Sequence, residues 1–141
     1  MLIHPNAYVA ENVEIGKDTV VVVGVVINPG VKIGAGGIIN TGVSVDYDCE
    51  ISDFVHTSVG AHVSGTVKSG NRTWIGAGAI VNNNLNIYGD CMGGAVVIKD
   101  IKEPGTYIGV PVKEKNMLKN KRGEVKLNSF TLGQKRHEVA A

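Results

Sequence analysis

The feature that most constrains this 141-residue chain is an apolar repeat with a period of six. From Ile3 to Ile87, thirteen of fifteen residues taken at every sixth position are Ile or Val, and the exceptions are Thr57 and Ser69. Four residues after each of these positions comes a second residue that is small or apolar. An α-helix needs apolar spacing near 3.6 residues and an ordinary strand needs spacing of 2, so the repeat excludes both.

A six-residue unit provides one short strand and one corner. Its large apolar side chain points inward, a small one packs beneath it, and the corner takes small or turn-forming residues. Three units close a triangle, and triangles stacked about 4.8 Å apart complete one another's backbone hydrogen bonds. Residues 3–92 therefore predict an all-β fold, a hexapeptide-repeat parallel β-helix of about five coils. Its left-handed sense is implied by families that share this repeat, not by the spacing.

The end of the repeat suggests where the coil domain stops. The register weakens at residues 92–94, residues 95–98 are expected to form a final strand, and residues 99–105 are expected to leave the coil. An apolar extended segment then reaches residue 112. Residues 1–112 carry 6 Lys/Arg against 10 Asp/Glu, and residues 113–141 carry 8 against 3. We therefore expect a β-helix domain over 1–112 and a short C-terminal extension, a basic tail over 113–141.

Composition excludes several classes of function. A net charge of +1 gives no general argument for binding nucleic acid or a membrane surface. No apolar run is long enough to span a bilayer, and the first residues do not resemble a signal peptide. Two cysteines make no disulfide framework, and Cys49 and Cys91 are expected to pack inside the coil as small apolar groups. These observations favour a cytoplasmic protein.

Side chains that carry chemistry are concentrated in the middle coils. His56 and His62 hold the last position of successive six-residue units, so both should point outward from adjacent faces. Asn40 and the run Asp46-Tyr47-Asp48 fall at corners, where Asn and Asp also serve as ordinary turn residues.

An apolar patch predicts self-association. Val22, Val23 and Val26 occupy outward positions of the second coil. Exposed apolar patches of this kind mark interfaces, and threefold packing suits a triangular prism. We therefore expect a homo-oligomer, most simply a homotrimer.

The chain resembles the sialic-acid O-acetyltransferase family of hexapeptide-repeat acyltransferases, which includes N-acetyltransferases of nucleotide-linked amino sugars. The resemblance covers about residues 2–113. It is carried by residues 3–9 (Ile-His-Pro-Asn-Ala-Tyr-Val), 38–42 (Ile-Ile-Asn-Thr-Gly), 46–56 (Asp-Tyr-Asp-Cys-Glu-Ile-Ser-Asp-Phe-Val-His), 60–65 (Gly-Ala-His-Val-Ser-Gly), 74–79 (Trp-Ile-Gly-Ala-Gly-Ala) and 109–113 (Gly-Val-Pro-Val-Lys).

This resemblance implies a homotrimer with an active site in each cleft between neighbouring coils, where acetyl-CoA is the co-substrate. A sugar amine or hydroxyl, or another small acceptor, would attack the thioester. The resemblance places Asn40 near the reacting centre and His56 against acetyl-CoA. Asp48 would help to orient or deprotonate the nucleophile, and Ala77 and Gly94 would contact the pantetheine arm through their backbones.

The chain departs from the family pattern in three places. Tyr47 stands where the family has its general-base histidine, and a phenol with an ordinary pKa near 10 is ionised in roughly one molecule in a thousand at pH 7. Either His56 takes over the proton, or acetyl transfer is slow or lost. Many members carry a nucleotide-sugar domain before the coil, whereas this sequence begins at the coils, which favours a small acceptor. The coil at residues 92–94 is also about two residues short against the family.

Two other functions fit the coil. A carbonic anhydrase of the gamma class would hold zinc with three neutral imidazoles. His56 and His62 would supply two of them, but they are six residues apart where those enzymes have a pair five apart. No third histidine lies in the middle coils. The second alternative is a non-catalytic trimeric scaffold that binds no CoA.

Overall fold

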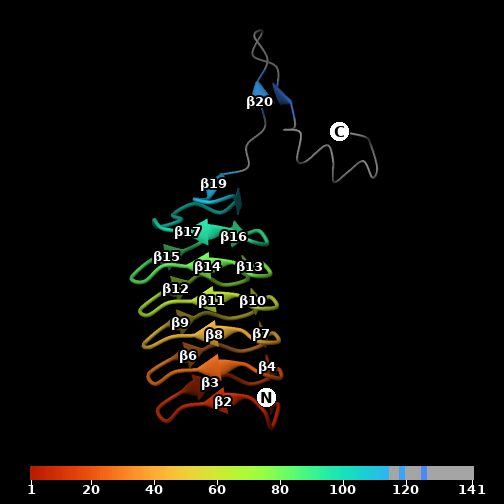
Figure 1. The fold of residues 1–141 in the computed structure, drawn as a ribbon, viewed down its shortest axis with the longest axis vertical. Coiled ribbons are helices and arrows are strands. Elements are labelled where there is room, and N and C mark those ends of the chain that lie inside the picture. The colour runs from red at the N-terminus through yellow and green to blue at the C-terminus, as the bar shows by residue number, and fades with distance from the viewer. Residues whose placement is uncertain (115–117, 120–124, 127–141) are drawn as a thin grey trace, which may run out of the picture.

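The computed structural model describes residues 1–114, 118–119 and 125–126, and almost every element in them is a two-residue strand (Figure 1). The strands stack into three parallel sheets, which are called faces A, B and C here. Face A contains β1 (Leu2–Ile3), β4 (Val20–Val21), β7 (Ile38–Ile39), β10 (His56–Thr57), β13 (Trp74–Ile75), β16 (Asp90–Cys91) and β18 (Thr106–Ile108), and β19 (Lys113–Glu114) pairs antiparallel with β18. Face B contains β2 (Tyr8–Val9), β5 (Val26–Ile27), β8 (Ser44–Val45), β11 (His62–Val63), β14 (Ile80–Val81) and β17 (Val96–Val97). Face C contains β3 (Glu14–Ile15), β6 (Lys32–Ile33), β9 (Glu50–Ile51), β12 (Lys68–Ser69) and β15 (Asn86–Ile87).

The repeat produces this solenoid because each coil provides hydrogen-bond partners for the backbone of the next. Val21 pairs with Ile39 and Ile39 pairs with Thr57, so residues eighteen apart lie directly above one another. The second residue of each strand points inward, and Ile27, Ile39 and Ile75 are fully buried. The parallel β-helix predicted from the sequence is confirmed.

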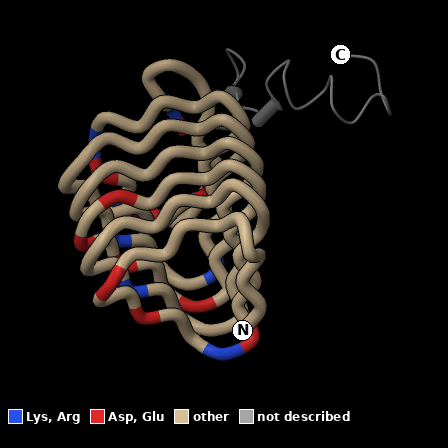
Figure 2. Tube along the Cα trace, turned by 60° about the horizontal axis from the view of Figure 1, so that its bottom comes forward, with Lys and Arg blue, Asp and Glu red and all other residues tan. Residues whose placement is uncertain are grey.

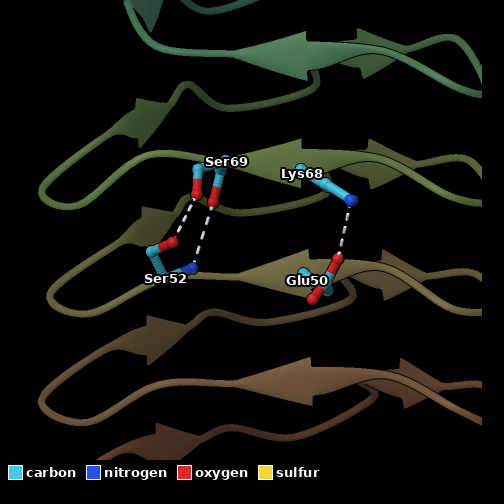
Figure 3. A network of polar contacts seen from close by, with 4 residues as sticks. All are labelled: Glu50, Ser52, Lys68 and Ser69. Atoms are coloured by element: carbon cyan, nitrogen blue, oxygen red, sulfur yellow. Dashed lines mark hydrogen bonds and ion pairs between the residues drawn. The ribbon is translucent and has the colours of Figure 1, made fainter.

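The two polar exceptions to the repeat are buried without losing their hydrogen bonds. The Thr57 hydroxyl donates to the carbonyl oxygen of Ile38 at 3.1 Å. The Ser52 hydroxyl donates to the carbonyl oxygen of Ser69 at 2.6 Å, and the Ser52 amide donates to the Ser69 hydroxyl at 3.4 Å (Figure 3). A hydroxyl can thus replace an apolar group in the stack because a neighbouring coil supplies its partner.

The coil continues further than the sequence predicts. The expectation that residues 99–105 leave it is wrong, because Ile101 is buried and forms a parallel bridge with Ile87. The chain therefore completes a sixth coil, and β18 begins another turn on face A. The solenoid has about six turns instead of five.

The shortening of the last coils is also placed differently from the prediction. Cys91 pairs with Ile75 only sixteen residues earlier, so two residues are missing before Cys91, at the turn 88–90, and not at residues 92–94. Cys91 therefore takes the inward strand position and not the corner position that the repeat predicts for it. It remains buried, as expected, because both positions face the core.

The proposed division at residue 112 lies where the described part of the chain becomes discontinuous. Residues 113–114 still pair with β18, and β20 (Leu118–Lys119) pairs antiparallel with β21 (Val125–Lys126). The rest of the predicted basic tail, residues 115–117, 120–124 and 127–141, lies outside the described residues. The boundary at 112 stays a prediction.

The outward side chains differ sharply between the three faces. Face C presents Glu14, Lys32, Glu50 and Lys68 in one vertical row. Lys68 Nζ lies 3.2 Å from Glu50 Oε2 (Figure 3), although both side chains are about half exposed and the pair contributes little stability. The outward rows of face A, from Leu2 to Trp74, and of face B, from Tyr8 to Val96, contain no Lys, Arg, Asp or Glu. Figure 2 shows the charged positions gathered toward one side of the coils. Across the described segments there is no helix with the length and hydropathy that a membrane span requires.

The depth of the core predicts how stability is distributed. Ile39→Ala, at a fully buried position in the third coil, is expected to lower the free energy of unfolding by about 2–5 kcal/mol. Ile15→Ala, at a half-buried position in the first coil, is the matched control and should cost less because its site is already open to water. Denaturant unfolding measures both, and equal losses would contradict the assigned stacking.

Candidate functional site

A bare edge runs along the solenoid between faces A and B. This AB edge consists of the turns 4–7, 22–25, 40–43, 58–61, 76–79 and 92–95. The first turn has Asn6 below Gly24, and each of the other five places a glycine at a positive φ of 68–74°: Gly24, Gly42, Gly60, Gly78 and Gly94. A Cβ added to any of the last four would meet no atom within 4 Å. The side of each of these glycines that a Cβ would occupy therefore faces open space.

The other two edges carry side chains at the same turn position. The BC edge has Asn12, Gly30, Asp48, Thr66 and Asn84 there, and the CA edge has Asp18, Gly36, Phe54 and Arg72. Non-glycine residues are thus compatible with this turn in this solenoid, at a modest conformational cost. The unbroken glycine column makes the AB edge the one on which a ligand can approach the backbone closely.

Three of the predicted site residues lie on the AB edge. Asn40 opens one turn, and its side-chain oxygen accepts a hydrogen bond from the Thr41 amide at 2.7 Å. Ala77 and Gly94 lie in successive turns, where the Gly94 amide donates to the Ala77 carbonyl oxygen at 2.8 Å. Both are exposed, so the backbone that the resemblance assigns to the pantetheine arm is accessible.

His56 borders this edge from face A. Its ring stacks on the indole of Trp74, with centroids 6.1 Å apart and planes 11° from parallel. Its Nε2 is buried and has no hydrogen-bond partner among the described residues. His56 thus points outward as predicted, but it is half buried, with one ring nitrogen sealed from water.

His62 borders the same edge from face B. It is exposed, and its Nδ1 lies 2.6 Å from the hydroxyl oxygen of Ser44 one coil below. The two histidines lie on either side of one turn but on different faces. No group of three or more His, Cys, Asp or Glu residues that could hold a metal ion occurs in the described part of the chain. The zinc alternative with His56 and His62 therefore has no complete ligand set within one described chain.

Tyr47 and Asp48 lie on the next edge, not on the AB edge. Asp46 organises their turn, because its Oδ1 accepts hydrogen bonds from the Tyr47 amide at 2.8 Å and from Asn28 Nδ2 at 3.2 Å. Tyr47 is 55% exposed, and Asp48 is exposed at φ 57°. The whole of face B separates these residues from Asn40 and His56. One chain therefore divides the predicted site residues between two edges.

Both thiols are poor nucleophiles. The pKa of the Cys49 thiol is raised to about 11, chiefly by burial and to a smaller extent by the charges of Asp46 and Asp48, against the lowering effect of backbone hydrogen bonds. Burial, with a smaller effect of Asp90, raises the pKa of Cys91 to about 12. Although Cys49 follows Tyr47 and Asp48 in sequence, its inward side chain takes no part in the site.

Two cationic side chains lie at the upper end of face B, where Lys99 follows β17 in the turn toward face C and Lys113 pairs with β18. Lys99 and Lys113 line a cavity of about 250 Å³ together with Ile98, Pro111 and Val112. The Val112 amide donates to the Val96 carbonyl oxygen at 3.0 Å, which holds this segment beside the last strand of face B. Ammonium groups at this point provide a place for anionic groups of a ligand.

Sequence reasoning missed the glycine column and the partner of His56. Glycines 24, 42, 60 and 78 recur every eighteen residues. Because one coil takes eighteen residues, this spacing predicts that they lie in one column. Trp74 lies eighteen residues after His56, and the same spacing places them side by side. The stacking geometry itself has no sequence signal.

Comparison with known proteins gives a consistent result. No protein-family profile matches the chain. Among solved structures, the acetyltransferase domain of PglB from Neisseria gonorrhoeae FA1090 is 37% identical, with a TM-score of 0.79 over 80% of this chain and 56% of that one. The same domain is also known in complex with acetyl coenzyme A.

A mutant of perosamine N-acetyltransferase from Caulobacter crescentus, in complex with CoA and GDP-perosamine, is likewise 37% identical. It has a TM-score of 0.78 and covers 81% of this chain and 55% of that one. AntD, an N-acyltransferase from Bacillus cereus, is 17% identical with a TM-score of 0.74 over 96% of this chain and 85% of that one, and this likeness shows the fold alone. The chain thus spans little more than half the length of the two proteins at 37% identity.

The raised thiol pKa values predict slow labelling and a loss of stability in alkali. At pH 7 the folded chain should react with a thiol reagent at least about 100-fold more slowly than the denatured chain, because thiolate is the reactive form. Since the folded pKa values lie above the unfolded value of 9.0, the stabilisation is complete below pH 9 and is lost as pH rises toward 11–12. Denaturant unfolding from pH 8 to 11 measures this loss. Cys49→Ala should reduce it, and an unchanged slope would contradict the burial of that thiol.

Proposed function

We propose that this chain, which belongs through its coil domain to the nucleotide-amino-sugar N-acetyltransferase family of hexapeptide-repeat acyltransferases, transfers an acetyl group from acetyl-CoA to a sugar amine or hydroxyl. The single observation that carries the proposal is the glycine column of the AB edge. The pantetheine arm of CoA is a thin chain with two amide groups, and bare backbone permits it to lie close and exchange hydrogen bonds. The relatives known in complex with CoA or acetyl-CoA support the same donor.

The thioester and the phosphates of the donor are assigned to different heights of the solenoid. The lysines at the top of face B, Lys99 and Lys113, would supply cations for the phosphates of CoA, and the thioester would end beside His56. Along the solenoid axis, Lys99 follows a strand two coils above His56, and Lys113 lies four strands above His56 in the order of face A. Ala77 and Gly94 lie between His56 and these lysines and would supply the backbone contacts.

A homotrimer is proposed because one chain leaves the catalytic set divided. Faces A and B present uncharged outward rows, including Val26 at 38% and Ile80 at 46% exposure, whereas face C presents the charged row. Copies that pack through the uncharged side would place the Tyr47 turn of one chain across a cleft from the AB edge of its neighbour. This arrangement brings Tyr47 and Asp48 to Asn40 and His56 without any change in the fold.

The proposed reaction is a direct acyl transfer. The acceptor's nitrogen or oxygen attacks the acetyl carbonyl carbon, the carbon–sulfur bond breaks, and CoA leaves as a thiolate that takes up the proton. His56 accepts the acceptor's proton and returns it to the sulfur, because an imidazole can both take up and release a proton. Asn40 and Asp48 orient the nucleophile, and the Tyr47 hydroxyl donates a hydrogen bond to it.

The acceptor is proposed to be a sugar amine, because one relative is known in complex with GDP-perosamine. Nothing in the described edges resembles a nucleotide-binding turn followed by a helix, so any nucleotide on the acceptor would need contacts beyond these residues. A reaction that consumes acetyl-CoA fits the cytoplasmic location predicted from the sequence.

Substitution on the glycine column tests donor binding. Gly78→Asn should fold, because Asn tolerates positive φ and a Cβ at this position meets no atom within 4 Å, but its side chain would stand on the AB edge. We expect at least a 10-fold weaker affinity for acetyl-CoA by calorimetry. In wild type, acetyl-CoA at 100 times its dissociation constant should add about 2.7 kcal/mol to the free energy of unfolding.

Asp18→Asn is the matched control, since Asp18 holds the same turn position on the CA edge at φ 60°. It should bind acetyl-CoA as wild type does. Equal affinities for the Gly78 variant and wild type would remove the AB edge as the donor site, and no thermal shift in wild type would leave the scaffold alternative.

Tyr47→His tests the base position. Because an imidazole is a better proton acceptor than a phenol at neutral pH, turnover should rise by at least about 10-fold. The measurement is release of CoA thiol from acetyl-CoA with GDP-perosamine as acceptor. Tyr8→His, at another exposed tyrosine, is the control. Unchanged turnover in the Tyr47 variant would mean that Tyr47 does not reach the acceptor.

A further inference from the structure

The imidazole of His56 is one member of a vertical row on face A. Ile38 pairs directly below it and Trp74 directly above it. Both neighbours are exposed, at 41% and 46%, so the three side chains form a stack on the outer surface. Because the indole lies nearly parallel to the imidazole, Trp74 limits the orientations open to the His56 ring.

Trp74 is itself held by a contact that occurs where the coils are shortened. In the coils below, the amide of the first strand residue on face A donates to a backbone carbonyl seventeen residues later, as His56 does to Thr73 at 3.0 Å. The turn 88–90 lacks two residues, and the Trp74 amide donates instead to the carboxylate oxygen Oδ1 of Asp90 at 2.8 Å. A side chain thus replaces a missing carbonyl at the strand that carries the indole.

One nitrogen of the stacked His56 ring is kept from water. Nε2 has essentially no accessible surface and no partner among the described residues, although the residue as a whole is only half buried. A buried polar atom without a hydrogen bond costs stability, so such atoms are rare unless a ligand uses them. No other buried side-chain nitrogen or oxygen in the described residues is unpartnered.

We propose that Trp74 is a positioning residue, fixed by Asp90, that holds the His56 ring in the stacked orientation from which it serves as the base. The assignment rests on the proposed acetyl transfer, in which His56 is the base. Trp74 therefore acts through His56 on kcat more than on the binding of acetyl-CoA along the AB edge.

The test uses the full chain with acetyl-CoA and GDP-perosamine, and thiol release is the readout. Trp74→Ala should lower kcat by at least 30-fold and change the KM for acetyl-CoA by less than 3-fold. Trp74→Phe keeps an aromatic face and should recover kcat to within about 5-fold of wild type. Asp90→Ala, which removes the acceptor of the Trp74 amide, should lower kcat in the same direction without altering the indole.

A matched control removes another exposed aromatic residue. Tyr88 is 49% exposed and packs over Gly70 on the CA edge, away from His56. Tyr88→Ala should leave kcat and KM unchanged. Thermal unfolding of each variant confirms that it folds, which is expected because Trp74 is half exposed.

A second readout needs no activity. The His56 ring protons, identified by their loss in His56→Gln, should resonate upfield in the proton NMR spectrum because of the indole ring current. Trp74→Ala should move them toward the values of the exposed His62, and Trp74→Phe should restore part of the shift.

The outcomes separate the two proposals. If the His56 resonances are unaffected by Trp74→Ala, or if kcat is unchanged, the positioning role is overturned. If acetyl-CoA does not bind wild type by calorimetry, the proposed function fails, and the NMR result still decides whether Trp74 orients His56. Binding of acetyl-CoA without turnover would overturn the role of His56 as a base held ready by Trp74.

Discussion

The structure depends on the hydrogen bonds that each coil makes with the next. Strands of only two residues have no independent stability, because a ladder this short leaves most of its backbone unpaired. Here the amides of each strand donate to carbonyl oxygens about seventeen residues later, as Val20 does to Gly37 and Ile38 to Val55. The inward rows of Ile and Val then exclude water from these ladders. The stacking of the coils and the burial of their apolar side chains therefore depend on each other. The strict six-residue period of the sequence is the result of this joint requirement.

That requirement also fixes where functional groups lie. Since one coil takes eighteen residues, a residue's edge or face follows from its place in the period, and Asn40 is confined to the AB edge as Tyr47 is to the BC edge. The chain cannot bring them together by bending. It changes the arrangement only by altering the length of a coil, as at the turn 88–90, where the lost carbonyl is replaced by the Asp90 carboxylate.

Much of the fold follows from the sequence because the repeat is both local and strict. The period predicts the inward rows, the burial of Cys49 and the outward direction of His56 and His62. It fails where the period fails: the expected exit at residues 99–105 is wrong, because Ile101 returns to the core after a second shortened step. The site was less predictable, because the short separation of Tyr47 and His56 in the sequence does not reveal that they lie at different edges of the solenoid. Nor does the sequence encode the tilt of the Trp74 indole, which depends on outward packing and not on the period.

A triangular solenoid is convex, and this explains why the candidate catalytic residues of one chain are divided between two edges. Side chains on flat faces point away from one another, so the backbone encloses no deep pocket around His56 or Tyr47. Concave, water-excluding space arises only where a second convex surface comes close, and the uncharged rows of faces A and B are the surfaces that can lose water at least cost. The glycine column of the AB edge leaves the backbone uncovered by side chains, so a thin ligand can lie along it. In such a fold the proposed trimer would complete the active site: the coil sets the position of each group along the axis, and a neighbouring copy would set the distance between them.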